Sequence, residues 1–416
     1  QIQYCIARGY AAPAPGSPTR PARTTLRARP SPRAMRSLPA LLALALLLTA
    51  SSCGPDGSPS GPDPLEPDPT IPGVPTDPTA PAPPAEPEPP AEPPPEWAFV
   101  PISGAQCRDG SATGVGLREV DGATDLLIAF DGGGACFNAA TCKGNRASYG
   151  PEDFATQMSR RADNGIFSLE ASNPVADWTA VYVPYCTGDL HGGTAENVAV
   201  PGVVGLQQFV GHLNLGATLD QLAPTVGTPE RVLVAGGSAG GYGALFAFDA
   251  VARRYPDAEL FLLTDSGPLL FDDAVFSPAF GGAIQALFGL PASVPDASLS
   301  APDALQSLYA YYAQTYPDAT LALASYTDDP TIRDYLEAGQ PGREISADAY
   351  ATALRNLERQ LPEAWHTYIV DGTGHVFVTK NEAYNGRTRA PNLSAWLADL
   401  LAGRGADVEP GLPEQE

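Results

Sequence analysis

The sequence predicts an α/β fold in which a mostly parallel sheet carries helices on both faces and a small cap segment. From residue 97 onward, short apolar runs alternate with helix-length amphipathic stretches. This rhythm is typical of repeated strand–helix–strand units. The runs are almost continuously apolar, as strands covered on both faces are.

Six runs are predicted to be buried parallel strands: 126–130, 180–183, 232–235, 260–263, 321–324 and 367–370. Four stretches have apolar residues at helical spacing: 204–222, 241–254, 304–315 and 347–361. In such sheets, functional groups gather at the carboxyl ends of the strands, so the residues just after each run are the candidates for a site.

The N-terminal part of the chain has the composition of export and tether segments. We expect residues 1–34 to precede the natural start. Met35 begins a stretch that is first basic, then rich in Leu and Ala, and then composed of small residues, and this order predicts a signal peptide over 35–52. Small residues that end at Cys53 indicate lipidation of that cysteine, with ordinary cleavage nearby as the alternative.

Residues 53–95 are rich in proline and acidic residues and are predicted to be a disordered linker. The folded domain is expected over 96–405, and 406–416 is expected to be a disordered tail. A linker of this composition favours extended conformations, which suits a tether to an envelope surface.

The charge balance excludes one class of partner. The 416 residues include 24 Lys and Arg against 47 Asp and Glu, which gives a formal net charge of −23. Such a chain repels phosphate backbones, so we exclude nucleic-acid binding.

Four of the six cysteines lie inside the predicted domain: Cys107, Cys136, Cys142 and Cys186. In an exported chain they suggest two disulfides, for which three connectivities exist. The short spacing of Cys136 and Cys142 could close a small loop. Zinc is disfavoured because the sequence has no CxxC pair, no HExxH motif and only four histidines.

A Gly-x-Ser-x-Gly pattern follows the run 232–235 and precedes a predicted helix. This placement matches a nucleophile elbow, in which glycines permit the strained turn that exposes a serine hydroxyl. Ser238 is therefore the candidate nucleophile. The alternative is a glycine-rich turn that merely binds an anion.

A serine nucleophile needs a base, and the base needs a carboxylate to orient it. His375 follows the last predicted strand, where the α/β-hydrolase order Ser, Asp, His places the base. For the acid we prefer Asp328, with its neighbour Asp329 as the alternative at the same strand end. Asp265 follows the earlier strand and is expected to brace the elbow.

Acyl transfer also needs donors for the developing oxyanion. The glycine-rich stretch 132–134 follows the first strong strand and can turn backbone amides inward. The amides of Gly133, Gly134 and Ala239 are the proposed oxyanion hole.

These motifs carry a family resemblance. The stretches 132–136, 183–193, 237–243 and 264–267 resemble those of the pectin acetylesterase family, which includes the Notum carboxylesterases. The block 184–191, Pro-Tyr-Cys-Thr-Gly-Asp-Leu-His, is the most specific of them. The resemblance covers about residues 107–380.

The resemblance implies an α/β-hydrolase with the triad Ser238, Asp328 and His375. It also implies the disulfides Cys136–Cys142 and Cys107–Cys186. We expect no cofactor. Many relatives have Trp beside the oxyanion glycines where this chain has Gly134 or Ala135, so an aromatic wall is expected to be missing. We interpret Asp189 and His191 as support for the site, with metal binding as the alternative.

The expected activity is hydrolysis of an acyl ester, first an acetylated polysaccharide or glycan. A lipid or protein acyl ester is the alternative, because the cap segment 268–290 contains Phe271, Phe276, Phe280 and Phe288. An alternative of another class is a non-catalytic surface adhesin on a hydrolase scaffold. We expect acetyl and butyryl esters to be preferred over octanoyl esters.

Overall fold

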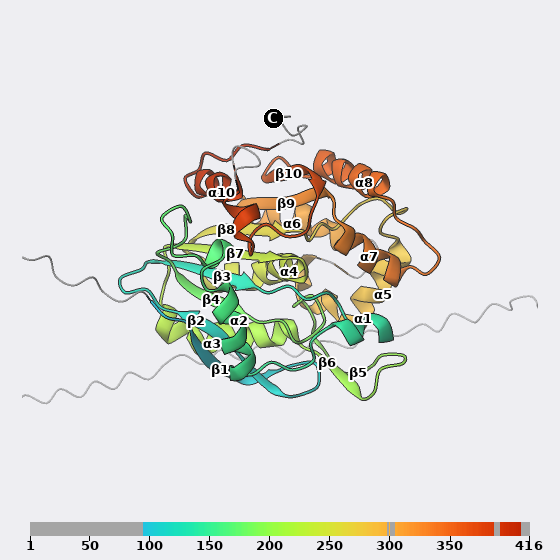
Figure 1. Cartoon of the computed structure of the whole chain (residues 1–416), viewed down its shortest axis with the longest axis horizontal. Helices are drawn as coiled ribbons and strands as arrows, with labels where there is room; N and C mark the ends of the chain where they lie inside the picture. The colour runs from blue at the N-terminus through green and yellow to red at the C-terminus, as the bar shows by residue number, and fades with distance from the viewer. Residues whose placement is uncertain (1–94, 298, 300–303, 387–391, 409–416) are drawn as a thin grey trace, which may run out of the picture. The chain divides into compact units, whose positions relative to one another are not determined.

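The structure, a computed structural model, describes residues 95–297, 299, 304–386 and 392–408 (Figure 1). The predicted upstream segment, signal peptide, lipidation residue Cys53 and linker lie outside these residues, apart from Pro95. Within the described ranges, no helix combines the length and the apolar character that a membrane span requires.

The described domain is built on an eight-stranded sheet in the order β1-β2-β4-β3-β7-β8-β9-β10. The bounds are β1 Ala98–Gln106, β2 Ala112–Arg118, β3 Asp125–Phe130, β4 Thr179–Val183, β7 Arg231–Gly237, β8 Glu259–Asp265, β9 Thr320–Asp328 and β10 Trp365–Thr373. The pairs β1–β2 and β2–β4 are antiparallel, and all other pairs are parallel. The predicted mostly parallel sheet is confirmed, and each of the six predicted strands is present.

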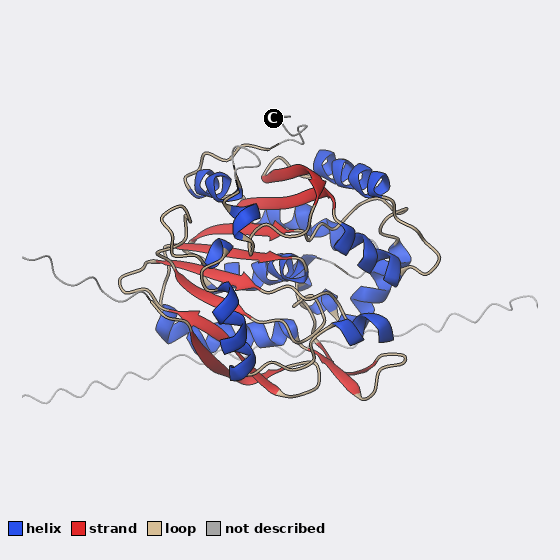
Figure 2. Cartoon of the chain, viewed as in Figure 1, coloured by secondary structure: helices blue, strands red, loops and turns tan. Residues whose placement is uncertain are grey.

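Helices lie on both faces of this sheet, as predicted (Figure 2). The longer ones are α2 Pro151–Arg161, α3 Gly211–Val226, α4 Ala239–Arg254, α5 Pro278–Phe288, α6 Ser307–Thr315, α7 Pro330–Gly339, α8 Ala347–Gln360 and α10 Leu393–Leu401. The short ones are α1 Ala139–Gly144 and α9 Asn381–Tyr384. In Figure 1, α1, α5 and α7 lie at the side toward which the central parallel strands point.

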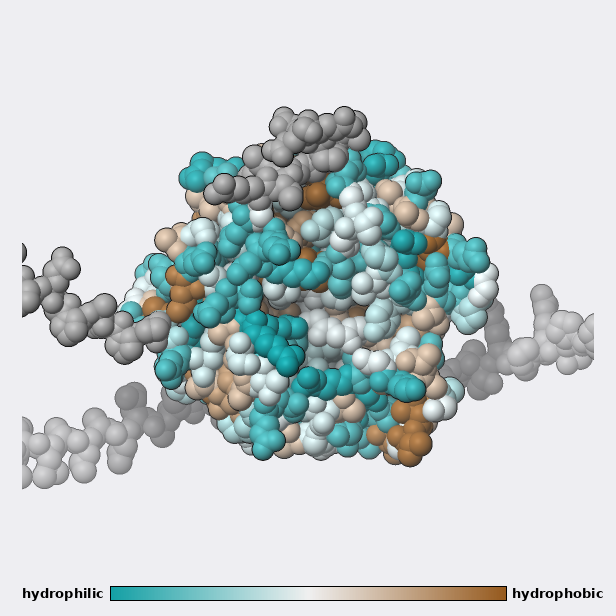
Figure 3. Space-filling view, viewed as in Figure 1, coloured by the Kyte–Doolittle hydropathy of each residue, from teal (hydrophilic) through white to brown (hydrophobic). Residues whose placement is uncertain are grey.

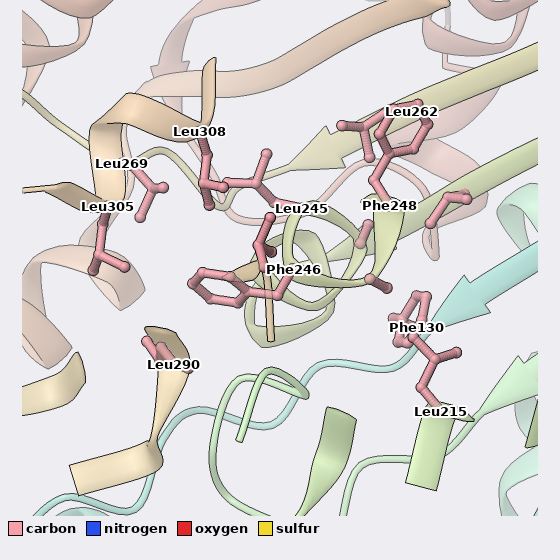
Figure 4. Packing of buried hydrophobic residues seen from close by; sticks show 14 of the residues in the cluster. Phe130, Leu215, Leu245, Phe246, Phe248, Leu262, Leu269, Leu290, Leu305 and Leu308 are labelled. Carbon is pink, nitrogen blue, oxygen red and sulfur yellow. The ribbon is translucent and has the colours of Figure 1, made fainter. Parts of the chain in front are cut away.

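Strand alternation divides the apolar residues into two cores. Along β7, Val232 and Val234 join one core, whereas Leu233 and Ala235 join the other. Helices α3, α4, α6 and α8 contribute to the first core, and α2 and α10 contribute to the second. Figure 4 shows part of the first core around α4, where Phe246 and Phe248 extend from the helix in different directions.

The prediction of a helix over 204–222 is wrong in its first part. The helix α3 begins at Gly211, and Leu206–Phe209 forms strand β6, which pairs with β5 (Ala195–Ala199). The predicted helix would bury Val204 and Leu206, but these two residues are 97% and 54% exposed. Figure 3 shows an apolar patch at its lower right, in the region where Figure 1 places this hairpin.

The predicted tail boundary is also wrong, because residues 406–408 belong to the fold. The Val408 amide donates to the Thr367 carbonyl over 2.8 Å, and the Ile369 amide donates to the Val408 carbonyl over 3.1 Å. Strand β10 is the edge of the sheet, so its outer backbone groups need partners, and the chain end supplies them. Residues 409–416 lie outside the described part.

Candidate active site

The predicted nucleophile lies on a sharp turn between β7 and α4. Ser238 has φ +61° and ψ −125°, a left-handed conformation that is strained for a residue with a side chain. Its amide donates to the Asp265 carbonyl over 2.9 Å. A Cβ on Gly240 would collide with the Phe130 carbonyl oxygen, so the glycine lets helix and strand approach closely. The sequence thus forms a strand–turn–helix elbow around Ser238.

His375 is held by Asp329, and the preference for Asp328 is wrong in this respect. The His375 Nδ1 atom lies 2.8 Å from Asp329 Oδ2, and Asp329 is fully buried. The Asp328 carboxylate instead accepts from the Thr373 hydroxyl over 2.7 Å and pairs with Arg333 at 2.9 Å. Because Nδ1 is engaged by Asp329, Nε2 is the ring nitrogen that can take a serine proton.

Asp329 rather than Asp328 contacts His375 because of the way in which α7 begins. Asp329 caps the helix, since its Oδ1 accepts from the Ile332 amide over 3.0 Å, and Pro330 occupies the first helical position. An Asp-Pro pair is a recognised signal of a helix start. Strand β9 ends at Asp328, and neighbouring side chains along an extended chain point to opposite sides. The Asp-Pro signal could therefore have favoured Asp329.

Asp265 is hydrogen-bonded to both the Ser238 segment and the His375 segment. Its backbone carbonyl accepts from Ser238, while its carboxylate accepts from the amides of Phe377 at 2.6 Å and Val378 at 2.9 Å. The expected brace on the elbow is therefore a backbone bond, and the side chain holds the histidine loop. Burial raises the pKa of Asp265 to about 6, so the carboxylate is mostly ionised at neutral pH.

The predicted oxyanion loop runs directly against the elbow. A Cβ built on Gly132 would lie 3.2 Å from the Ser238 Cβ and 2.8 Å from the Gly237 carbonyl oxygen. Gly134 has φ +77°, which favours glycine. Among the described residues, the amides of Gly133 and Gly134 meet no hydrogen-bond acceptor. These amides are available as donors, as is the Ala239 amide in the first turn of α4.

His191 holds the start of this loop by a hydrogen bond to its backbone. Its Nε2 lies 2.8 Å from the Asp131 carbonyl oxygen, immediately before the glycines. Burial lowers the pKa of His191 to about 4, so the ring is neutral and its proton is on Nε2, which donates to the carbonyl. The Asp131 carboxylate is anchored by Arg161 and by Gln157. The loop is thus fixed at its first residue.

Asp189 supports the same block of sequence. Its carboxylate accepts from the Thr187 hydroxyl at 2.6 Å, the His191 amide at 3.0 Å and the Gly211 amide at 2.7 Å. These bonds satisfy a fully buried carboxylate. Throughout the described ranges, no three His, Cys, Asp or Glu side chains are grouped so that they could hold a metal ion.

Both disulfides implied by the resemblance are confirmed. Cys107 pairs with Cys186, and Cys136 pairs with Cys142. The second bond closes a small ring at the end of the oxyanion loop, where the Cys136 amide also donates to the Gly188 carbonyl over 2.7 Å. The block 184–191 is therefore attached to the loop by a backbone hydrogen bond, and its Cys186 is joined by a disulfide to Cys107.

We predict that tryptic peptide mapping of the purified chain without reductant will recover Cys136 joined to Cys142 and Cys107 joined to Cys186. The same digest after reduction and alkylation is the control. It should separate the Cys107 peptide from the Cys186 peptide, and it should add two alkyl groups to the single peptide 119–143, which contains both Cys136 and Cys142. Four free thiols, or stoichiometric bound zinc, would contradict the pairing.

An apolar pocket opens beside Ser238. Including its open mouth, it holds about 610 Å³ of empty space. Its lining residues are Gly134, Ala135, Phe137, Leu190, Ser238, Ala239, Tyr242, Phe246, Leu269, Phe276, Phe280, Ile284, Leu305, Ile332, Tyr335 and Leu336. Figure 4 shows Phe246 extending from α4 toward Leu269 and Leu305. The elbow, cap and α7 thus share one cavity.

The cap residues are only partly as expected. Phe276 and Phe280 line the pocket, whereas Phe288 packs on Phe209 with ring centres 4.8 Å apart and Phe271 packs on Tyr309 at 6.2 Å. The aromatic wall beside the oxyanion loop is present after all. It comes from Phe137 and Tyr335, whose ring centres are 6.5 Å apart.

The comparison with known families agrees with this geometry. Residues 99–296 match the family model described as Pectinacetylesterase. This stretch is a pectinacetylesterase-family domain. The match includes Ser238 and the oxyanion loop and ends before Asp329 and His375, so the assignment of those two residues rests on the geometry above.

The chain is also similar to carboxylesterases over part of its length. The chain is 31% identical over 175 residues to the palmitoleoyl-protein carboxylesterase notum1' of Xenopus laevis, which covers 39% of this chain and 34% of the relative. It is 31% identical over 177 residues to the palmitoleoyl-protein carboxylesterase NOTUM of Homo sapiens, with the same coverages. The aligned part is about a third of the length of these relatives.

The fold is shared with a solved structure. The Wnt deacylase Notum from Drosophila superposes with a TM-score of 0.58 at 18% identity, covering 76% of this chain and 96% of that one. The likeness confirms the α/β-hydrolase-like fold of the described domain.

Proposed function

We propose that this protein is a serine carboxylesterase that hydrolyses an acyl ester through Ser238, His375 and Asp329. The observation that carries the proposal is the left-handed elbow, which presents Ser238 to an apolar pocket. The Asp329-held histidine supports it. Carboxylesterase relatives are consistent with the same chemistry.

The proposed reaction has two halves. Ser238 Oγ attacks the ester carbonyl while His375 Nε2 takes the hydroxyl proton, and the amides of Gly133, Gly134 and Ala239 stabilise the negative oxygen. His375 then passes the proton to the leaving alcohol, which leaves an acyl group on Ser238. Water activated by the same histidine hydrolyses this acyl-enzyme and restores the serine.

The pocket supports a longer acyl chain than acetyl. Its walls are almost entirely aliphatic and aromatic, and they extend from Ser238 across the cap to Ile284 and Leu305. An acetyl group would leave most of this apolar surface without a partner, whereas a longer chain gains free energy with each buried methylene. We therefore favour a lipid or protein acyl ester over an acetylated glycan, the reverse of the first expectation from the sequence.

We expect kcat/KM for nitrophenyl esters to rise from acetyl to about octanoyl, by roughly two- to fourfold per methylene. Ile284→Phe, which narrows the pocket, should reduce the octanoyl rate far more than the acetyl rate. A series of esters from two to twelve carbons measures both. A maximum of kcat/KM at acetyl or butyryl would reject the long-chain proposal and favour an acetylesterase instead.

Export is part of the proposal. Two disulfides are typical of proteins that fold in an oxidising compartment. The signal peptide over 35–52 and lipidation of Cys53 stay predictions from the sequence.

A further inference from the structure

Tyr335 on α7 is packed against the oxyanion loop. A Cβ built on Gly134 would collide with the Tyr335 hydroxyl oxygen and would lie 2.9 Å from its Cε1 atom. The phenol end of Tyr335 therefore occupies the space that a side chain at position 134 would need. This contact brings a side-chain hydroxyl beside one of the proposed oxyanion donors.

Besides the Ser238 hydroxyl, the Tyr335 hydroxyl is an uncommitted donor among the described residues that line the pocket. Tyr335 lines the same cavity as Ser238 and Ala239. The other phenol of the lining, Tyr242, donates to the Pro268 carbonyl over 3.1 Å. Within the described part of the chain, no hydrogen-bond partner is found for the Tyr335 hydroxyl.

The phenol is also suited to donate. The Tyr335 side chain is only partly buried, which leaves it accessible to a bound ester. Burial raises the pKa of Tyr335 above its ordinary value, so the hydroxyl keeps its proton at neutral pH. A protonated hydroxyl in an apolar cavity makes a stronger bond to an anionic oxygen than to a neutral carbonyl.

We propose that Tyr335 is a further catalytic residue, whose hydroxyl donates a hydrogen bond to the substrate oxygen that becomes negative in the tetrahedral intermediate. It acts beside the amides of Gly133, Gly134 and Ala239. No proton is transferred from Tyr335, because the bond is made as charge develops and is released when the carbonyl re-forms. The inference rests on the proposed esterase function.

Tyr335→Phe tests the hydroxyl while it keeps the ring and its packing. We expect kcat to fall about 10- to 100-fold with KM within twofold, because the bond is strongest in the transition state. Affinity for a boronic acid that forms a tetrahedral adduct with Ser238 should weaken in parallel. Tyr311→Phe is the matched control, since that hydroxyl bonds to Asp249 outside the pocket.

The possible outcomes separate the two proposals. An active wild-type esterase whose Tyr335→Phe variant has unchanged kcat and boronate affinity would overturn the role of Tyr335 alone. A change in KM without a change in kcat would do the same, because it would show Tyr335 to be only a wall of the pocket. A wild-type chain that hydrolyses no ester would overturn both proposals.

Discussion

Ser238→Ala is expected to lower the hydrolysis of an acyl ester by about 10⁴-fold or more while the fold is retained. Only the Oγ atom is lost, and the alanine methyl occupies the position of the serine Cβ on the same turn. The amide bond to Asp265 is unaffected because it is made by the backbone. Ester turnover and a thermal unfolding curve of both chains measure the two parts of this result.

A fluorophosphonate probe supplies an independent control. The wild-type chain should be labelled at Ser238, and the alanine variant should remain unlabelled. Turnover that survives in the variant would place the nucleophile elsewhere. A wild-type chain with neither labelling nor turnover would favour the adhesin alternative.

Asp329→Asn is expected to lower kcat by roughly 10³- to 10⁴-fold. The amide keeps the size of the side chain but cannot balance a positive imidazolium, and its NH₂ group can favour the wrong histidine tautomer. Steady-state kinetics of the variant and the wild-type chain measure this effect.

Asp328→Asn is the matched control for this prediction. Its carboxylate contacts Thr373 and Arg333, not the imidazole, so we expect a less than tenfold loss in kcat. If the larger loss fell on Asp328, the observed geometry would not be the catalytic one, and the original assignment from strand order would stand.

Much of the fold could be predicted because the central strands are buried on both sides. Runs such as 232–235 and 260–263 are apolar throughout, and short apolar runs that alternate with helical stretches are typical of parallel strands covered on both faces. Strand β1 was not predicted, because most of its residues are exposed or half-buried and it lacks a continuous apolar run. The β5–β6 hairpin was missed because its apolar residues are on the surface.

The candidate site could be predicted at positions where the backbone conformation or a close approach requires glycine. The elbow around Ser238 and the loop at Gly134 need glycine, and these glycines can be recognised directly in the sequence. The choice between Asp328 and Asp329 depended on the direction of a side chain at a strand end, which strand order alone does not give. Tyr335 could not be placed at all, because a tyrosine on an amphipathic helix carries no sign of which distant loop it will meet.

Asp265 has a consequence for how the site responds to thermal motion. The segments that carry the candidate nucleophile and the candidate base are far apart in the sequence, yet both are hydrogen-bonded to this one residue, through its carbonyl and its carboxylate. We therefore expect a displacement of this end of β8 to move the Ser238 and His375 segments together. The proposed proton transfer would then depend less on bending of the sheet than it would if the two segments were held by separate strands.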